Sequence, residues 1–416
     1  MTVPKSVAGF AAIASAVRLL NEISPALQYD LARDMDELNH DLRQSIAGNP
    51  PLQDFDDHLK SAIRSLFGQM EAFTFSLVTA VLEVGPQDIS NEDLAVLKER
   101  DYSPTTDLIS TDMRRYPLAL RLKTACRWFL TVCGVTETQN WPAETERHFK
   151  DLTRVRNRLT HPTRIEDLIV TGAFGSFRHI AFWFPAYARH VLTTASQEAG
   201  LPSTVGQPVP AIPDSLGAIP QVNQVFDEGF YSQVFSNPSI AIRYIGFFSR
   251  QLDDELTRAF AYSRTALAPP YNPEVIGRSV RRMIRAITTN LEGLTGFTSF
   301  FMRAVRRRSR GRVRFPQIVK GEPPPERAIK VLAAFSAAFG NDVVPEKNSS
   351  WGALCQVFDL RDRLTHPRKA ADVLLGVDEL STAMTALGWL VNQASSAVLL
   401  DVDKMDDCLG SRRPKA

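Results

Sequence analysis

The chain has 416 residues, of which 44% are hydrophobic and 23% are charged. This composition is typical of globular proteins and excludes a disordered, collagen-like or coiled-coil chain. A domain usually takes about 100–200 residues, so two domains are expected. With 48 Lys and Arg against 46 Asp and Glu, the formal net charge is +2 and by itself indicates no partner. The cysteines form no Cys-x2-Cys pair, which argues against a zinc ribbon or a disulfide framework.

The N-terminal segment bears on the localisation of the protein. The apolar stretch after Lys5 could belong to a signal peptide, but it continues with helical spacing through Arg18 to Ile23. No other segment offers the roughly 18 uncharged apolar residues that a membrane span needs. The sequence therefore predicts a cytoplasmic protein that does not bind a membrane.

Apolar residues at intervals of three and four predict amphipathic helices along the whole chain. Pro162 and Pro367 each end one of them, because proline disfavours helical backbone in the residue before it. No segment alternates apolar and polar residues in a way that predicts a strand. The expected helices cover residues 1–32, 67–82, 120–132, 144–159, 177–196, 225–265, 284–305, 328–339, 351–364 and 381–400.

The second half of the chain repeats the first. Residues 154–162 and 359–367 are identical at six of nine positions, 205 residues apart, and both end in Arg-Leu-Thr-His-Pro. Weaker similarity extends to both sides, as an old tandem duplication would leave it. The predicted fold class is all-α, with two tandem up-and-down helical bundles. We expect domains at 1–200 and 223–405, a linker with five prolines at 201–222, and a flexible tail at 406–416.

Among the histidines, His161 and His366 are the two that recur in register. Histidine titrates near neutral pH and arginine suits phosphate, so each run offers a proton carrier and a cation. The Asn or Asp four residues before the histidine shares its helical face and is expected to orient the imidazole. The first motif supplies Arg156, Asn157, Arg158 and His161, and the second supplies Arg361, Asp362, Arg363 and His366.

These two motifs resemble the HEPN superfamily, whose signature is Arg-x4–6-His at a helix end in a four-helix bundle. Many members are metal-independent endoribonucleases of toxin–antitoxin, abortive-infection and CRISPR systems, in which two motifs meet in one cleft of a dimer. The resemblance implies that this chain is an endoribonuclease whose two HEPN-like bundles form an intramolecular pseudo-dimer. It also implies an RNA substrate, no cofactor, a defence or toxin role, and a protein regulator or antitoxin as a partner. A higher oligomer is compatible with it.

The mechanism that the resemblance implies uses the 2′-hydroxyl of RNA as the nucleophile. One histidine removes its proton and the other protonates the leaving 5′-oxygen. Arg156 and Arg361 stabilise charge on the phosphorane, and Arg158 and Arg363 bind RNA nearby. The alternatives are a non-catalytic RNA-binding or antitoxin-like module, and a helix C-terminal cap in which His and Arg complement the dipole.

An arginine-rich segment is the second indication of a nucleic-acid partner. Residues 271–330 carry 14 Arg and Lys against four Glu, and arginine clusters bind phosphate backbones. A solvated or salt-bridged face, an acidic partner and membrane docking are the alternatives. The expected RNA-binding arginines are Arg278, Arg281, Arg282, Arg285, Arg306, Arg307, Arg308 and Arg310.

No metal is expected, because the sequence shows no grouping of carboxylates, His and Cys with ligand spacing. His148, His179 and His190 have no counterpart in the second repeat and are taken as ordinary residues. Cys126 and Cys133 are expected to pack in the core.

Overall fold

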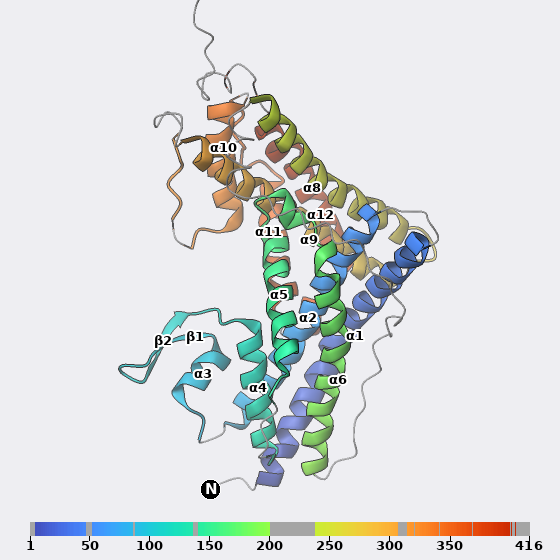
Figure 1. Ribbon diagram of the computed structural model, residues 1–416, viewed down its shortest axis with the longest axis vertical. Coiled ribbons are helices and arrows are strands. Elements are labelled where there is room, and N and C mark those ends of the chain that lie inside the picture. The colour runs from blue at the N-terminus through green and yellow to red at the C-terminus, as the bar shows by residue number, and fades with distance from the viewer. Residues whose placement is uncertain are drawn as a thin grey trace, which may run out of the picture. The chain divides into compact units, whose positions relative to one another are not determined.

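The computed structural model is mostly α-helical, which confirms the all-α fold class (Figure 1). The linker and tail expected at 201–222 and 406–416 lie outside the residues that the structure describes. The described residues are 5–46, 52–85, 88–135, 140–199, 238–306, 314–319, 321–340, 342–367, 369–399, Asp401 and Lys404.

The chain divides into two compact units that each include a short segment from the other half of the sequence. Unit 1 comprises residues 1–153, 173–218 and 363–374, and unit 2 comprises residues 154–172, 219–362 and 375–416. The units differ from the expected domains at 1–200 and 223–405 in these two segments. As a result, His161 belongs to unit 2 and His366 belongs to unit 1.

Unit 1 is built around α2, which contacts α1, α4 and α6. Its apolar positions recur with the helical period, so Leu59, Leu66 and Leu77 are all fully buried. Phe73 of α2 meets Phe184 of α6 edge to face, with ring centroids 5.7 Å apart. The helices are α1 (Lys5–Ile46), α2 (Leu52–Val84), α4 (Leu118–Val132), α5 (Ala143–Thr160, which continues into unit 2) and α6 (Phe174–Glu198).

A small insertion lies between α2 and α4. It contains α3 (Asn91–Lys98), β1 (Arg100–Ser103) and β2 (Leu108–Met113), and the two strands form an antiparallel hairpin. Glu99, in the left-handed region at φ 50°, ends α3 and turns the chain into β1. The expectation that no strand is present was wrong here, because a short exposed hairpin does not need the alternating pattern of a half-buried strand.

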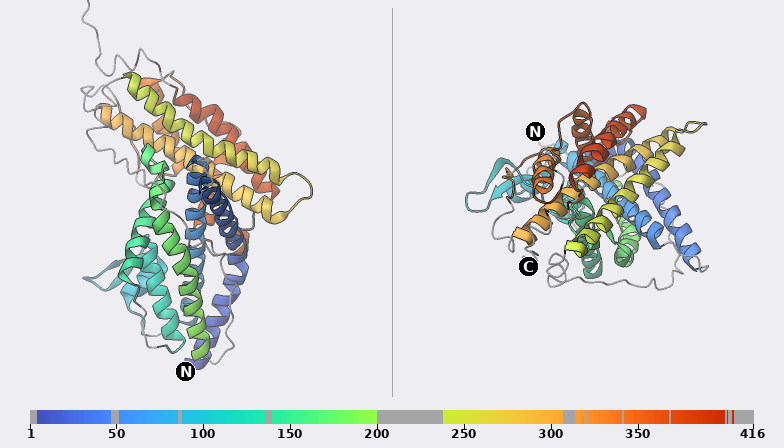
Figure 2. Two further views of the ribbon diagram at one scale, coloured as in Figure 1. Left: turned by 45° about the vertical axis from the view of Figure 1, so that its right-hand side comes forward. Right: turned by 90° about the horizontal axis from the view of Figure 1, so that it is seen from above.

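Unit 2 repeats the same scheme around α9, which contacts α8, α10 and α12. Figure 2 shows α8 running beside α9. Phe248, Phe297 and Phe301 stack in its core with less than 2% exposure each. The helices are α8 (Pro238–Ala266), α9 (Pro273–Arg306), α10 (Pro324–Phe339), α11 (Trp351–Thr365, which ends in unit 1), α12 (Val377–Trp389) and α13 (Ser395–Ala397).

The last expected helix, 381–400, is interrupted. A π-helical turn at Leu390–Ala394 separates α12 from α13. Such turns insert one extra residue into a helix and are not visible in apolar periodicity.

The two motif helices end where proline predicts. α5 ends at Thr160 and α11 at Thr365, each two residues before its proline. The backbone N–H of His161 still donates to the carbonyl oxygen of Asn157 at 3.1 Å. Each motif histidine is thus the first residue past its helix, at a defined position. Short 3-10 turns follow at Ile165–Leu168, Thr171–Ala173 and Ala370–Asp372.

Two described helices are long and apolar enough to span a membrane by length and composition alone. One window lies in Val7–Gln44 near the N-terminus and is 33% buried, and the other lies in Phe55–Val84 and is 83% buried. The second is the central helix of unit 1, so its apolar residues are accounted for by the core. This feature alone is weak evidence for a membrane.

Candidate functional site

The second unit brings one residue from each motif onto a single carboxylate. Nδ1 of His161 lies 3.1 Å from Oε2 of Glu292, and Nη2 of Arg361 donates to Oε1 of the same side chain. Glu292 lies on α9 and its side chain is only 5% exposed, whereas the side chain of His161 is 60% exposed. The buried carboxylate therefore fixes an arginine and an accessible imidazole that are 200 residues apart in the sequence. We call these three residues the Glu292 cluster.

The residues expected to orient the imidazoles have other partners. Nη1 of Arg361 donates to Oδ1 of Asp362 at 2.8 Å, and Nη1 of Arg156 donates to Oδ1 of Asn157 at 3.2 Å. Asn157 and Asp362 are both exposed. The partner of each motif histidine is instead a glutamate from the central helix of its unit.

The segment 154–172 is seated on α9 by close backbone packing. A Cβ added at Gly296 would lie 2.9 Å from the carbonyl oxygen of Pro162. A Cβ added at Gly293 would lie 3.1 Å from the Cγ of Pro162. The guanidinium of Arg164 stacks over the ring of Phe300, 5.2 Å from its centroid. Because glycine leaves room for Pro162, the backbone beside His161 is held directly against the helix that carries Glu292.

The turn after His161 is also fixed. Oδ2 of Asp167 accepts from the backbone N–H groups of Thr163 and Arg164 at 2.9 and 3.0 Å. Nε of Arg158, whose side chain is 60% exposed, lies 3.8 Å from Oδ1 of the same carboxylate. The expected RNA-binding cation Arg158 is therefore at the surface of unit 2.

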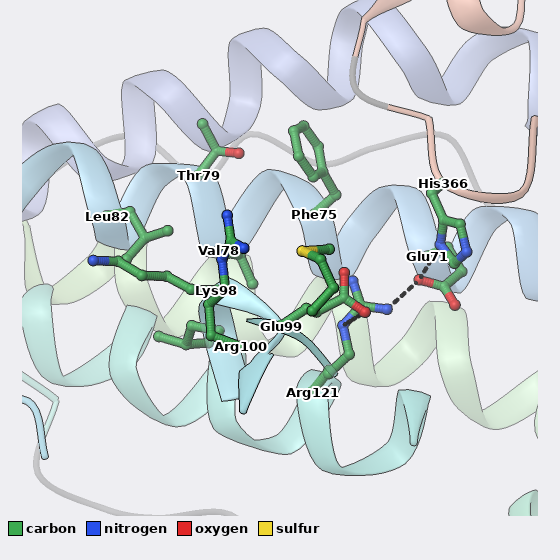
Figure 3. A pocket seen from close by; sticks show the side chains of 12 residues that line it. Glu71, Phe75, Val78, Thr79, Leu82, Lys98, Glu99, Arg100, Arg121 and His366 are labelled. Atoms are coloured by element: carbon green, nitrogen blue, oxygen red, sulfur yellow. Dashed lines mark hydrogen bonds and ion pairs between the residues drawn. The ribbon is translucent and has the colours of Figure 1, made fainter. Parts of the chain in front are cut away.

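Unit 1 holds a second cluster of the same composition, shown in Figure 3. Nδ1 of His366 lies 3.6 Å from Oε2 of Glu71, to which Nη1 of Arg121 donates at 2.8 Å. Nε of Arg121 lies 3.5 Å from Oε1 of Glu99. The side chains of Glu71 and Arg121 are 6% and 8% exposed, and that of His366 is 26% exposed. We call Glu71, Arg121 and His366 the Glu71 cluster.

A pocket of about 300 Å³ adjoins the Glu71 cluster. One wall is α2, from Glu71 to Leu82, and the insertion supplies Lys98, Glu99 and Arg100 (Figure 3). The pocket thus combines apolar side chains with charged groups of both signs beside His366.

Sequence reasoning missed both glutamates, although a signal for them exists. Ile63-Arg64 and Glu71 recur as Ile284-Arg285 and Glu292 at a constant distance of 221 residues. Phe73-Thr74 also recurs as Phe297-Thr298, but at a distance of 224 residues, which is one helical turn out of this register. A search for recurring charged residues inside buried helices would have found the pair.

The arginine stripe expected to bind RNA is partly inside the protein. Arg278 and Arg281 are each 2% exposed, so assigning them to a solvent-facing RNA surface was wrong. Nη1 of Arg278 donates to the hydroxyl of Tyr262 at 2.7 Å, and the Tyr262 ring also receives Arg282 at 4.8 Å. Periodicity alone could not separate a cationic surface from cations packed between two helices.

The remaining predicted RNA-binding residues are placed as follows. Arg282 and Arg285 are half-buried on α9, and Arg363 is exposed at the end of α11. Arg306 is the last residue of α9, and the structure does not describe its side chain. Arg307, Arg308 and Arg310 lie outside the described residues.

His148 and His179, taken from the sequence as ordinary residues, come together in unit 1. Their rings lie 4.5 Å apart, and Glu144 joins them. Cys126 and Cys133 are buried, as expected, and burial raises the pKa of each thiol to about 12. Thiols with such pKa values stay neutral and unreactive at neutral pH.

Comparison of the chain with protein-family models, with curated proteins and with solved structures finds no match. The functional interpretation therefore depends on the two motifs and on the geometry of the clusters around Glu71 and Glu292.

Proposed function

We propose that the protein is a metal-independent endoribonuclease of the HEPN type, in which the two Arg-x4-His motifs act together. The observation that carries this proposal is the Glu292 cluster, where His161 of the first motif and Arg361 of the second bind the same buried carboxylate. A helix cap would need neither residue to contact another helix. The contact of both residues with Glu292 instead indicates that the first and the second motif act together.

The geometry suits proton transfer next to a phosphate. Glu292 engages Nδ1 of His161 and so leaves Nε2 of an exposed imidazole to exchange a proton with a substrate. Arg361 is held beside it, where its guanidinium can stabilise charge that develops on a phosphorane. His366, whose Nδ1 lies 3.6 Å from Oε2 of Glu71, is the second proton carrier that a base-and-acid mechanism requires.

The reaction is transesterification at phosphorus. The 2′-hydroxyl oxygen attacks while one histidine takes its proton, and the bond to the 5′-oxygen breaks as the other histidine protonates that oxygen. The products are a 2′,3′-cyclic phosphate and a 5′-hydroxyl end. DNA lacks the nucleophile and is not cleaved. We assign the protein to the cytoplasm, with RNA as substrate, the pseudo-dimer as its working form, and a regulatory or antitoxin protein as a partner.

The test is incubation of end-labelled RNA with the protein in EDTA, with the same sequence as DNA alongside. Cleavage of RNA alone, ending in a 2′,3′-cyclic or 3′-phosphate, is expected for the wild type and absent for a His161→Ala, His366→Ala double variant. His190→Ala, an exposed histidine on α6 outside both motifs, serves as the matched control. Full activity in the double variant, or 3′-hydroxyl ends, would refute the assignment.

A non-catalytic RNA-binding or antitoxin-like module is the second candidate. It is favoured by the engagement of Arg361 and Arg121 with buried carboxylates, which leaves exposed cations such as Arg158 and Arg363 to meet phosphate. It predicts RNA binding that falls with salt but no cleavage under any condition.

A further inference from the structure

A second group of titratable side chains lies apart from both motifs, where the start of α5 meets the start of α6. Glu144 and His148 are four residues apart on α5 and so share one face of it. His179 comes from α6. One ligand atom from each of the three side chains lies within 4.8 Å of the other two.

The spacing within this group fits a divalent transition metal. Nε2 of His148 lies 3.6 Å from Oε1 of Glu144. Zn²⁺ binds imidazole nitrogen and carboxylate oxygen at about 2.0–2.2 Å, which puts two ligands of a tetrahedral ion about 3.4 Å apart. The imidazole rings of His148 and His179 are 4.5 Å apart, with 33° between their planes. The three ligand atoms, all within 4.8 Å of one another, are therefore close to the spacing that one ion requires.

The surroundings hold the imidazoles in an orientation that suits ligation. Nδ1 of His148 is hydrogen bonded to the hydroxyl of Ser176 at 3.0 Å, which turns its Nε2 toward Glu144. Histidines that bind metals usually donate their other ring nitrogen in this way. Thr145, buried beside His179, lies 3.0 Å from its Nε2 and offers a further oxygen.

We infer that Glu144, His148 and His179 form a binding site for Zn²⁺ or a similar divalent transition metal, with water or a hydroxyl as the fourth ligand. Imidazole and carboxylate together suit Zn²⁺ better than Ca²⁺ or Mg²⁺, which prefer oxygen ligands only. The ion clamps the first turn of α5 to α6 within unit 1. The second repeat has no such site, because Ser349 and Ala353 stand 205 residues after Glu144 and His148.

The role of this ion is structural, and it is separate from RNA cleavage. It lies eight residues before Arg156 on α5, about 12 Å along the helix at 1.5 Å per residue. Removing it is expected to loosen the start of α5 without removing any residue of the Glu292 or Glu71 clusters. The inference therefore stands or falls independently of the nuclease.

The experiment uses the full chain without a histidine tag, stripped with EDTA and then dialysed. Titration with Zn²⁺ by calorimetry is expected to show one ion per chain. Co²⁺ in its place is expected to give the visible absorption of a four- or five-coordinate nitrogen and oxygen site. His148→Gln and His179→Gln are each expected to weaken binding by at least about 100-fold, since even the loss of an outer-shell partner costs 10–100-fold.

His190→Gln, on the same helix α6 but outside the group, is the matched control and is expected to bind as the wild type does. Thermal melting in EDTA shows that each variant still folds, and added Zn²⁺ is expected to raise the Tm of the wild type and the control only. Absence of stoichiometric binding by the folded wild type would overturn the inference. Equal affinity in the wild type and both His→Gln variants would overturn it as well.

Discussion

The Glu292 and Glu71 clusters contain the same three kinds of side chain but differ in the origin of the arginine. Glu292 binds Arg361, a motif residue, whereas Glu71 binds Arg121 of α4, which belongs to neither motif. His161 is 60% exposed and His366 is 26% exposed. The two clusters thus share a carboxylate and a histidine but have different surroundings. One copy is open to solvent, and the other adjoins a pocket made partly by the insertion.

The largest expected effect concerns the two histidines themselves. His161→Ala and His366→Ala should each reduce single-turnover cleavage of RNA by about 10²-fold or more, because base and acid are both needed. The double variant should be little worse than the worse single, since residues acting as a unit are non-additive. If the two clusters were instead independent active sites, each single variant would keep about half of the rate.

Replacing the two arginines should separate their roles. Arg361→Ala is expected to cost stability, since it leaves the buried Glu292 without this partner, and also to reduce cleavage by the folded protein by on the order of 10²-fold, because it removes the cation beside His161. Arg121→Ala is expected to act mainly on folding and cost about 3 kcal/mol of unfolding free energy, since it leaves Glu71 buried without this partner. Urea denaturation and cleavage rates measured on both variants test this. If Arg361→Ala and Arg121→Ala lost the same stability and the same cleavage rate, the two arginines would not differ in role.

The contact of Pro162 with α9 offers a smaller effect confined to unit 2. Gly296→Ala should destabilise the protein by about 1–3 kcal/mol, because the new methyl group meets the Pro162 carbonyl. Gly352→Ala on α11 meets nothing within 4 Å and is the matched control, expected to be neutral or slightly stabilising. Chemical denaturation compares the two. A Gly296→Ala protein as stable as the control would show that Pro162 is not seated as described.

The smallest expected effect is at the pocket beside His366. Lys98→Ala should raise KM for RNA a few-fold with kcat unchanged and lower the slope of log K against log salt by about one, as the loss of one phosphate contact does. Lys150→Ala, an exposed lysine on α5, is the control. Unchanged KM and salt dependence in Lys98→Ala would show that the pocket does not bind RNA.

Constraints that act over a few residues predicted the helices. The features that were not predicted depend on contacts between residues far apart in the sequence. Pro162 and Pro367 end their helices as expected, because that constraint acts within two residues. The glutamates were not predicted, since a charged residue inside a buried helix shows its purpose only when its partners from other helices are known. The same applies to Arg278 and Arg281, whose burial depends on Tyr262 and other packing that periodicity does not encode.

The metal group and the hairpin were missed for a related reason. Glu144 and His148 have helical ligand spacing, but the third residue, His179, comes from another helix and is separated from them by the motif. The hairpin at Arg100–Met113 pairs mainly with itself and carries no core face, so it left no pattern of burial in the sequence.

Because each unit includes a segment from the other half of the sequence, neither unit can be completed until late in protein synthesis. Unit 1 includes residues 363–374, which bring His366 to Glu71. Translation at about 5–20 residues per second delivers this segment on the order of 10 s after residue 218 has been added. During that interval the ribosome carries a first half whose Glu71 cluster lacks its histidine, while residues 154–172 wait for α9. A nascent chain that has not yet reached Arg361 therefore has neither cluster complete, because Arg361 and His366 each supply one member of a cluster.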